Sequence, residues 1–194
     1  MSHITGAVLA GGRGSRMGGE DKGLLPLAGT PMILHVIRAL KPQVGQIIIN
    51  ANRNSSAYAG LGYPVVGDHH ADFQGPLAGM AAVLRLATTD WVQCAPCDTP
   101  NLPADLVARL WRAVGGTNAR IALPHDGQRI QPLFALVHRD LLPTLDADIA
   151  AGRLAVGRWM RDQPHVEVDF SDCPEGFVNL NTPEEWASHQ SCGS

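Results

Sequence analysis

The sequence predicts an α/β fold in which helices cover both faces of an open, mostly parallel β-sheet. Short apolar, β-branched runs alternate along the chain with segments of helical periodicity. Those segments are long enough to serve as the crossover connections that parallel strands require. A chain of 194 residues with no internal repeat or linker also predicts one domain, residues 1–187, followed by a C-terminal tail, residues 188–194.

Seven runs are expected to form strands. The first, residues 4–9, is apolar and stops at a run of glycines, which is typical of a buried strand. The last, residues 166–170, alternates apolar and polar residues, which indicates a half-exposed strand. The expected strands are residues 4–9, 46–50, 63–66, 91–95, 120–123, 133–137 and 166–170.

Helices are expected between these strands. Pro31 and Pro76 suit the first turn of a helix, because that position needs no backbone N–H. After Pro76, apolar residues recur close to the i, i+3, i+4, i+7 spacing of one helix face. The expected helices are residues 31–40, 76–87, 103–114, a segment from about 139, and 153–161. The result is a three-layer, Rossmann-like arrangement, in which ligands bind at the carboxyl ends of the strands.

Composition and charge exclude several classes of protein. A hydrophobic fraction of 45% excludes a wholly disordered chain, and a net charge of −3 argues against a general nucleic-acid binder. No uncharged apolar run reaches the roughly 20 residues of a membrane span. No Lys or Arg precedes the first apolar stretch, so we expect no signal peptide. Four cysteines are too few for a disulfide scaffold, which favours a cytoplasmic location.

The strongest functional signal is the glycine-rich segment that follows the first strand, residues 9–23. Glycines let the backbone approach a ligand and direct successive N–H groups at an anion. Three cations stand in this segment: Arg13, Arg16 and Lys22. The segment is not a dinucleotide fingerprint, because Met17 occupies the third glycine position, and not a Walker A motif, because Gly23 follows the lysine. We therefore predict a phosphate-binding loop rather than a plain surface loop.

Polar residues at the ends of the expected strands are further candidates. Asp98 follows the strand at 91–95, where a carboxylate can hold Mg²⁺ together with phosphate oxygens or can simply cap a turn. Asn50 ends another strand and Asp68 follows a third. The Asp68 carboxylate can accept the adjacent N1–H and N2–H donors of a guanine, or it can be an ordinary loop residue.

Two other features have a structural explanation beside a functional one. The helix that begins after Gly75 has free N–H groups that can bind a phosphate or ribose oxygen, and Gly79 permits the close approach of a ligand or of a packed neighbour. Cys94 and Cys97 form a C-x-x-C pattern. Because Cys94 lies inside an apolar strand, we expect buried thiols rather than a redox or zinc site.

Five segments in order, spanning nearly the whole chain, carry a resemblance to a known family. They are LAGGRGSRMGGEDKGLLPLAGTPM (residues 9–32), Asn50-Ala51-Asn52-Arg53, Gly75-Pro76-Leu77-Ala78-Gly79, Pro96-Cys97-Asp98-Thr99-Pro100 and the run from Phe177 to Glu185. Together they resemble the molybdenum cofactor guanylyltransferases of the nucleotidyltransferase superfamily. The resemblance implies the fold of the nucleotide-diphospho-sugar transferases. It also implies transfer of GMP from GTP to the terminal phosphate of molybdopterin, with or without bound molybdenum, and release of pyrophosphate.

The resemblance also implies the residues of the site and the molecules that it binds. Catalytic roles fall on Arg16, Lys22 and Asp98, and Asp98 is expected to bind Mg²⁺ as the cofactor. The expected GTP-binding residues are Leu9, Ala10, Gly11, Gly12, Gly14, Lys22, Asn50, Asp68 and Asp98. The expected molybdopterin-binding residues are Gly75, Gly79, Gln131, Asn179 and Asn181. The resemblance also implies partner proteins that insert or accept the molybdenum cofactor. It implies no binding to nucleic acid or to a membrane.

Several other functions stay open. The nearest is the same chemistry with CTP, in a molybdopterin cytidylyltransferase. A sugar-1-phosphate nucleotidyltransferase is disfavoured by the chain length and by the loop sequence. Lys22 and Asp98 argue against a GTP-binding adaptor without turnover, since binding alone would not need the metal carboxylate. A redox module would require labile thiols at Cys94 and Cys97.

Overall fold

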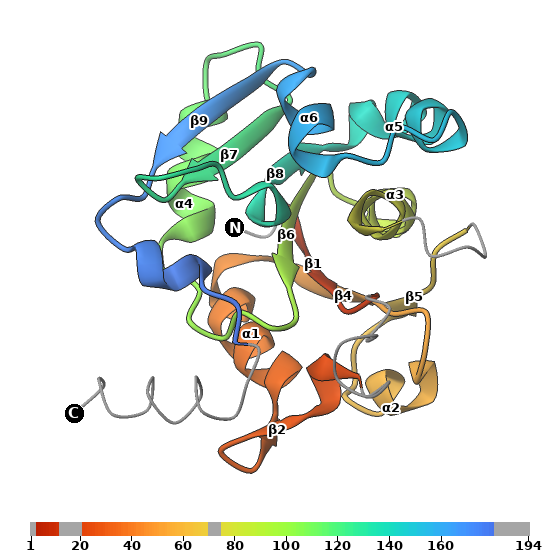
Figure 1. Ribbon diagram of the computed structural model, residues 1–194. Coiled ribbons are helices and arrows are strands. Elements are labelled where there is room, and N and C mark those ends of the chain that lie inside the picture. Colours follow the sequence, from red (N-terminus) through yellow and green to blue (C-terminus); the bar gives the residue numbers. More distant parts are fainter. Residues whose placement is uncertain (1–2, 12–20, 70–74, 181–194) are drawn as a thin grey trace.

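The chain folds around a seven-stranded sheet with the strand order β5-β4-β1-β6-β8-β7-β9 (Figure 1). The structure, a computed structural model, describes residues 3–11, 21–69 and 75–180. Neighbouring strands pair in parallel, except that β8 runs antiparallel to both β6 and β7. The strands of this sheet are β1 (Ile4–Leu9), β4 (Gln46–Asn50), β5 (Val65–Val66), β6 (Trp91–Pro96), β7 (Ile121–His125), β8 (Leu136–His138) and β9 (His165–Asp169).

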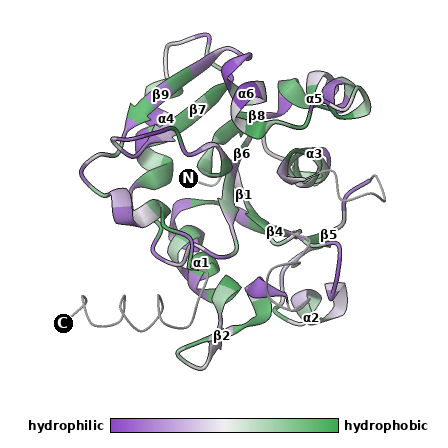
Figure 2. Cartoon of the chain, viewed as in Figure 1, coloured by the Kyte–Doolittle hydropathy of each residue, from purple (hydrophilic) through white to green (hydrophobic). Residues whose placement is uncertain are grey.

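Helices cover both faces of the sheet, which confirms the predicted fold class (Figure 1). Apolar residues of α1 and α4 pack on one face with Ile4 and Val8 of β1. Those of α3, α5 and α6 pack on the other face with Ala7. Side chains of β1 therefore alternate between two cores, and Figure 2 shows the central strands as apolar. The helices are α1 (Met32–Leu40), α2 (Ser55–Ala59), α3 (Pro76–Leu86), α4 (Leu106–Val114), α5 (Leu142–Ala150) and α6 (Val156–Arg161).

Two helices lie especially close to the sheet. A Cβ at Gly6 would lie 2.9 Å from Leu40 Cδ2, so the glycine lets α1 pack directly against β1. Every residue of α3 from 77 to 84 is buried, because α5 packs against the helix in addition to the sheet. Arg85 of α3 donates two hydrogen bonds to Asp146 of α5, which joins the two helices at their surface.

The run 133–137, predicted as one strand, is divided in the structure. Leu133 and Phe134 belong to a 3-10 turn (Pro132–Phe134), and β8 covers only the three residues that begin at Leu136. Pro132 explains the division, because its ring fixes φ near about −65° and it has no N–H to donate to a neighbouring strand. The prediction of a strand at residues 133–135 was therefore wrong.

Other elements differ from the prediction at their ends. Helices α4, α5 and α6 each begin three residues later than predicted, and a 3-10 turn (Arg139–Leu141) leads into α5. Neither α2 nor the small hairpin of β2 (Pro26–Leu27) and β3 (Thr30–Pro31) was predicted. The hairpin turns through Ala28 and Gly29, both of which have positive φ.

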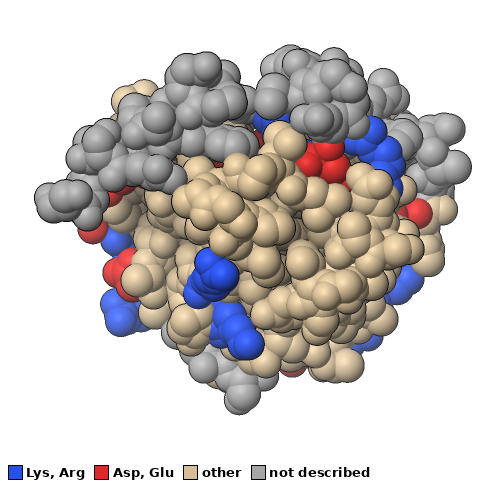
Figure 3. Space-filling view, turned by 90° about the horizontal axis from the view of Figure 1, so that it is seen from below, with Lys and Arg blue, Asp and Glu red and all other residues tan. Residues whose placement is uncertain are grey.

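The predicted tail, residues 188–194, lies outside the described residues. Within the part of the chain that the structure describes, no helix is both long and apolar enough to cross a membrane. The lower face of the molecule carries few charged side chains among those that are described (Figure 3), in keeping with the charged fraction of 17%.

Candidate functional site

Three neighbouring strands, β4, β1 and β6, end at one edge of the sheet, and backbone hydrogen bonds continue between the segments that follow them. Ala10 N–H donates to Asn50 O at 2.8 Å, and Cys97 N–H donates to Leu9 O at 3.1 Å. These bonds hold the three segments side by side. Asn50 and Asp98 consequently lie at the same edge, where parallel α/β sheets bind their ligands.

Lys22 and Asp98 meet at this edge, although 75 intervening residues separate them in the sequence. Lys22 begins a 3-10 turn (Lys22–Leu24), and its Nζ lies 3.4 Å from Asp98 Oδ2. The two side chains are 28% and 15% exposed, so a charged ligand can reach both. The separation exceeds the usual range of about 2.7–2.9 Å for a charge-assisted hydrogen bond, so the pair is a loose ion pair. The other predicted loop residues, Gly12, Gly14 and Arg16, lie outside the described residues.

Asp68 is held by two asparagines from the end of β4. Asn50 Nδ2 donates to Asp68 Oδ1 at 2.9 Å, and Asn52 Nδ2 donates to Asp68 Oδ2 at 2.6 Å. The Asp68 N–H in turn donates to Asn52 Oδ1 at 2.7 Å. Asn50 and Asp68, both predicted to bind GTP, are therefore in contact. Asn52 was not predicted to take part, although it belongs to the segment Asn50-Ala51-Asn52-Arg53 that carries the family resemblance.

Glycines around this cluster make room for the asparagines. A Cβ at Gly79 would collide with Asn50 Oδ1, and a Cβ at Gly11 would lie 3.0 Å from the same atom. The close neighbour expected at Gly79 is thus a protein side chain. Gly75 has a φ of 79° at the N-cap of α3, and Pro76 occupies the first turn as predicted. The positive φ at this position is enough to account for a glycine, so no contact with a ligand is needed to explain it.

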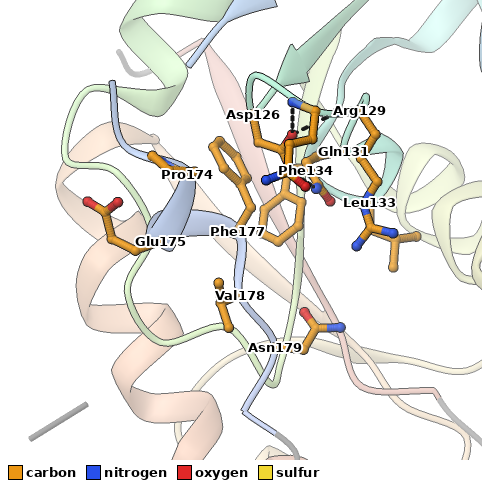
Figure 4. Close-up of a pocket in the computed structure, with 11 residues that line it drawn as sticks. Asp126, Arg129, Gln131, Leu133, Phe134, Pro174, Glu175, Phe177, Val178 and Asn179 are labelled. Atoms are coloured by element: carbon orange, nitrogen blue, oxygen red, sulfur yellow. Dashed lines mark hydrogen bonds between the residues drawn. The ribbon is translucent and has the colours of Figure 1, made fainter. Parts of the chain in front are cut away.

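A pocket of about 700 Å³ lies between the segment 126–134 and the segment 174–179 (Figure 4). Gln131 and Asn179, two of the residues predicted to bind molybdopterin, both line it. Phe134 and Phe177 form an aromatic wall, with ring centroids 5.0 Å apart and the rings edge-on. Because the two residues are only 2% and 5% exposed, they back the pocket with apolar surface rather than offer it an open face.

The pocket adjoins the strand end that carries Asp98. Thr99 is fully buried, and its Oγ1 donates to Asn179 Oδ1 at 2.8 Å. One residue further on, Leu180 N–H donates to Asp98 O at 2.9 Å. The described residues that line the pocket include neither Gly75 nor Gly79, and Asn181 lies outside the described residues.

Asp126 fixes the wall of the pocket to which Gln131 belongs. Its Oδ1 accepts hydrogen bonds from the N–H groups of Gln128 and Arg129, both at 2.8 Å, and its Oδ2 accepts one from Gln131 Nε2 at 2.5 Å (Figure 4). Desolvation is the largest single influence on the pKa of Asp126 and acts to raise it, but these hydrogen bonds and the Arg129 charge together lower it. The carboxylate therefore stays ionised and holds the Gln131 amide with its nitrogen turned toward Asp126. Asp126 was not predicted, although an Asp-Gly pair is a turn signal.

The thiols of the C-x-x-C pattern are buried, as expected. Cys94 is 1% exposed and Cys97 is 8% exposed. Burial raises the pKa of Cys94 to about 12 and is also the largest cause of the raised pKa of Cys97. Neither thiol forms the thiolate that redox exchange requires near neutral pH. Among the described residues, no three His, Cys, Asp or Glu side chains are grouped closely enough to hold a metal ion by themselves.

Comparison with known proteins gives consistent matches over almost the whole chain. The family described as MobA-like NTP transferase domain matches residues 6–167. The molybdenum cofactor guanylyltransferase of Cupriavidus pinatubonensis is 48% identical, with 96% of each chain covered. That of Shewanella putrefaciens is 44% identical, with 94% of each chain covered. Among solved structures, the molybdopterin-guanine dinucleotide biosynthesis protein A of Archaeoglobus fulgidus has a TM-score of 0.79 at 21% identity, with 97% of each chain covered.

Proposed function

The chain belongs to the family of MobA-like NTP transferase domains, and we propose that it transfers GMP from GTP to the terminal phosphate of molybdopterin, releasing pyrophosphate. The observation that carries this proposal is the position of Asp98. Its side chain faces Lys22, while its backbone contacts the segment that lines the pocket. A nucleotide at the Lys22 side and an acceptor in the pocket would therefore meet at one carboxylate.

The reaction needs little covalent chemistry from the protein. A phosphate monoester is largely ionised near pH 7, so an oxygen of the acceptor phosphate can attack the α-phosphorus of GTP directly. The bond between the α-phosphorus and its bridging oxygen to the β-phosphorus breaks, and pyrophosphate leaves with that electron pair. Catalysis then rests on positioning and on neutralisation of charge. Lys22 supplies a positive charge at the strand edge where the phosphates would lie.

Asp98 fits a role in holding Mg²⁺. Magnesium binds through one or two carboxylates together with substrate phosphates, and does not require a cage of protein ligands. One partly exposed carboxylate facing the phosphate side, without a further cluster of ligands among the described residues, matches that pattern. When bound, the ion supplies positive charge to phosphate oxygens. The part of Asp98 itself is to place a carboxylate at the point where the two substrates meet.

Asp68 is suited to recognise guanine. An ionised carboxylate has about four acceptor positions, and the amides of Asn50 and Asn52 use two of them. The two positions that are left match the adjacent N1–H and N2–H donors of guanine. A cytosine presents one amino donor beside two acceptors, so it would leave one of the Asp68 positions opposite an acceptor.

The pocket of Figure 4 is the proposed site of the pterin ring. Phe134 and Phe177 offer an apolar wall, and Gln131 and Asn179 offer amides for its polar edge. Arg129, on the rim, adds a positive charge for an anionic acceptor.

A pyrophosphate-release assay tests the proposal. Purified protein is mixed with Mg²⁺ and with either molybdopterin or a sugar phosphate as acceptor, and GTP, CTP and ATP are supplied in turn. Release with GTP and formation of the guanine dinucleotide are expected. Release with CTP alone would assign the protein to cytidylyl transfer, and release only with a sugar phosphate as acceptor would overturn the assignment to molybdopterin.

A further inference from the structure

Helix α2 supplies two side chains to Asp21, the residue directly before Lys22. Tyr58 Oη donates to Asp21 Oδ1 at 2.5 Å, and Asn54 Nδ2 donates to Asp21 Oδ2 at 3.3 Å. Both oxygens of this carboxylate are therefore held from one short helix. The contact links residues 37 positions apart in the sequence, so it fixes the end of the glycine-rich segment against a separate element.

Tyr58 is committed to this contact by its surroundings. Its side chain is fully buried, so its hydroxyl has no access to bulk water as an alternative partner. Burial raises the pKa of Tyr58, and the neighbouring Cys97 and Asp21 raise it further. The hydroxyl therefore keeps its proton and remains a donor near neutral pH.

Asn54 is also directed away from its usual role. It occupies the N-cap of α2, where an asparagine ordinarily accepts a hydrogen bond from its own helix. Among the described residues its side chain makes no such cap bond, and its backbone has a φ of 50°, in the left-handed region. The amide is turned instead toward Asp21.

Gly23 holds the other side of the lysine. A Cβ at Gly23 would lie 2.5 Å from Tyr58 Oη and 3.3 Å from Cys97 Sγ, so the turn can pack here only because this residue is glycine. The residue before Lys22 is thus fixed by hydrogen bonds and the residue after it by close packing. The lysine projects from this fixed backbone to within 3.4 Å of Asp98.

We propose that Tyr58 is a positioning residue that sets the place of Lys22 opposite Asp98 by holding Asp21. This inference rests on the proposed function for its catalytic consequence, since it is there that Lys22 acts on the phosphates. Without the Tyr58–Asp21 contact, Lys22 still carries its positive charge, but its ammonium group spends less time beside the phosphates of the transition state. The variant Tyr58→Phe should consequently lower kcat more than it raises KM for GTP.

The position of Lys22 can be measured without any substrate. The chain has two lysines, Lys22 and Lys41, so protein labelled with ¹³C at lysine Cε gives two signals that a Lys22→Ala variant assigns. Tyr58→Phe removes one hydroxyl and should move the Lys22 signal. The matched control is Tyr63→Phe, which removes the hydroxyl of the other tyrosine, whose ring lies 6.0 Å from Lys41 Nζ, and should leave the Lys22 signal in place. A Lys22 signal that is unchanged in Tyr58→Phe overturns the proposal.

A second variant separates the loss of the contact to Asp21 from a loss of folding. Asn54→Gly removes the amide and suits a φ of 50° better than any other residue, so its backbone strain falls. It should shift the Lys22 signal in the same direction as Tyr58→Phe, by a smaller amount because its bond to Asp21 is longer. A shift in neither variant, with both proteins folded, contradicts the role assigned to Asp21.

Kinetics then separate positioning from a general structural effect. Tyr58→Phe should lower kcat for GMP transfer about tenfold, the value of one hydrogen bond to a charged group, with KM for GTP changed less than about twofold. In a Lys22→Ala background the same substitution should have no further effect, because the residue through which it acts is gone. An equal tenfold loss in that background would show that Tyr58 acts by another route. If the wild type transfers no GMP, the proposed function fails, while the Lys22 signal still decides the role of Tyr58.

Discussion

The variant Asp68→Asn tests whether this carboxylate reads the base. The substitution keeps the shape of the side chain but replaces one oxygen by an NH₂ group. In the structure both oxygens already accept hydrogen bonds, from Asn50 Nδ2 at 2.9 Å and from Asn52 Nδ2 at 2.6 Å. In the variant, one amide donor would face another donor, or the NH₂ group would face guanine in place of an acceptor.

The expected loss follows from the hydrogen bonds that remain. A carboxylate with two of its four acceptor positions occupied can accept both guanine donors, whereas an amide can accept at most one of them. Hydrogen bonds to charged groups contribute about 1.5–3 kcal/mol each. Losing one, and changing the other from charged to neutral, should cost about 3 kcal/mol in kcat/KM for GTP. That is about a 100-fold decrease.

The assay is pyrophosphate release with molybdopterin as acceptor and with GTP or CTP in parallel. Asp68→Asn should lower kcat/KM for GTP, mainly by raising KM. The value of kcat/KM for CTP should change less than about threefold, so the ratio of kcat/KM for GTP to that for CTP should fall. The control is Asp162→Asn, an exposed carboxylate whose partner Arg158 lies 3.8 Å away in a weak surface pair. A ratio of GTP to CTP activity equal to that of the wild type would refute base recognition by Asp68.

Three further predictions follow from the site and its surroundings. Lys22→Ala should lower kcat about 100-fold or more by removing one charge-stabilising contact while the melting temperature stays near that of the wild type, and near-normal turnover would contradict its role. Asp126→Ala frees Gln131 and should raise KM for molybdopterin about tenfold with KM for GTP unchanged; equal changes in both would contradict separate subsites. Burial raises the pKa of Cys94 from 9.0 to about 12, so above pH 9 the unfolded chain loses a thiol proton that the folded chain keeps. The free energy of unfolding from urea titrations should therefore fall as pH rises from 9 towards 12, by up to about 1.4 kcal/mol per pH unit from this thiol, and less steeply in Cys94→Ala.

The half of the site that depends on the sheet could be predicted from the sequence. The runs at β1, β4 and β6 are apolar, short and separated by helical patterns, so a parallel sheet follows. Once the strands are parallel, their carboxyl ends must share an edge. The proximity of Asn50 and Asp98 therefore follows from where their strands end, before any side-chain contact is known.

The supports of the site were harder to predict, because they depend on tertiary contacts. Helix α2 has five residues and no apolar stripe, so nothing in its own sequence indicates a helix. It exists where Tyr58 can be buried and can donate to Asp21, a residue that lies 37 positions earlier. The contact between Asp126 and Gln131 is local, but it depends on a turn through Gly127, which has a φ of 93°.

Two carboxylates of the site, Asp68 and Asp126, are held differently from the surface carboxylate Asp146. Asp146 pairs with the guanidinium of Arg85, which neutralises its charge. Asp68 and Asp126 are held by amides and backbone N–H groups, which fix the direction of a carboxylate without cancelling its charge. Such groups would repel a triphosphate but would attract the N–H edge of a heterocycle. The cation Lys22 stands apart from them, beside Asp98. In the proposed function, Asp68 would face the guanine ring and Asp126 would orient Gln131 toward the pterin ring, while Lys22 would face the phosphates.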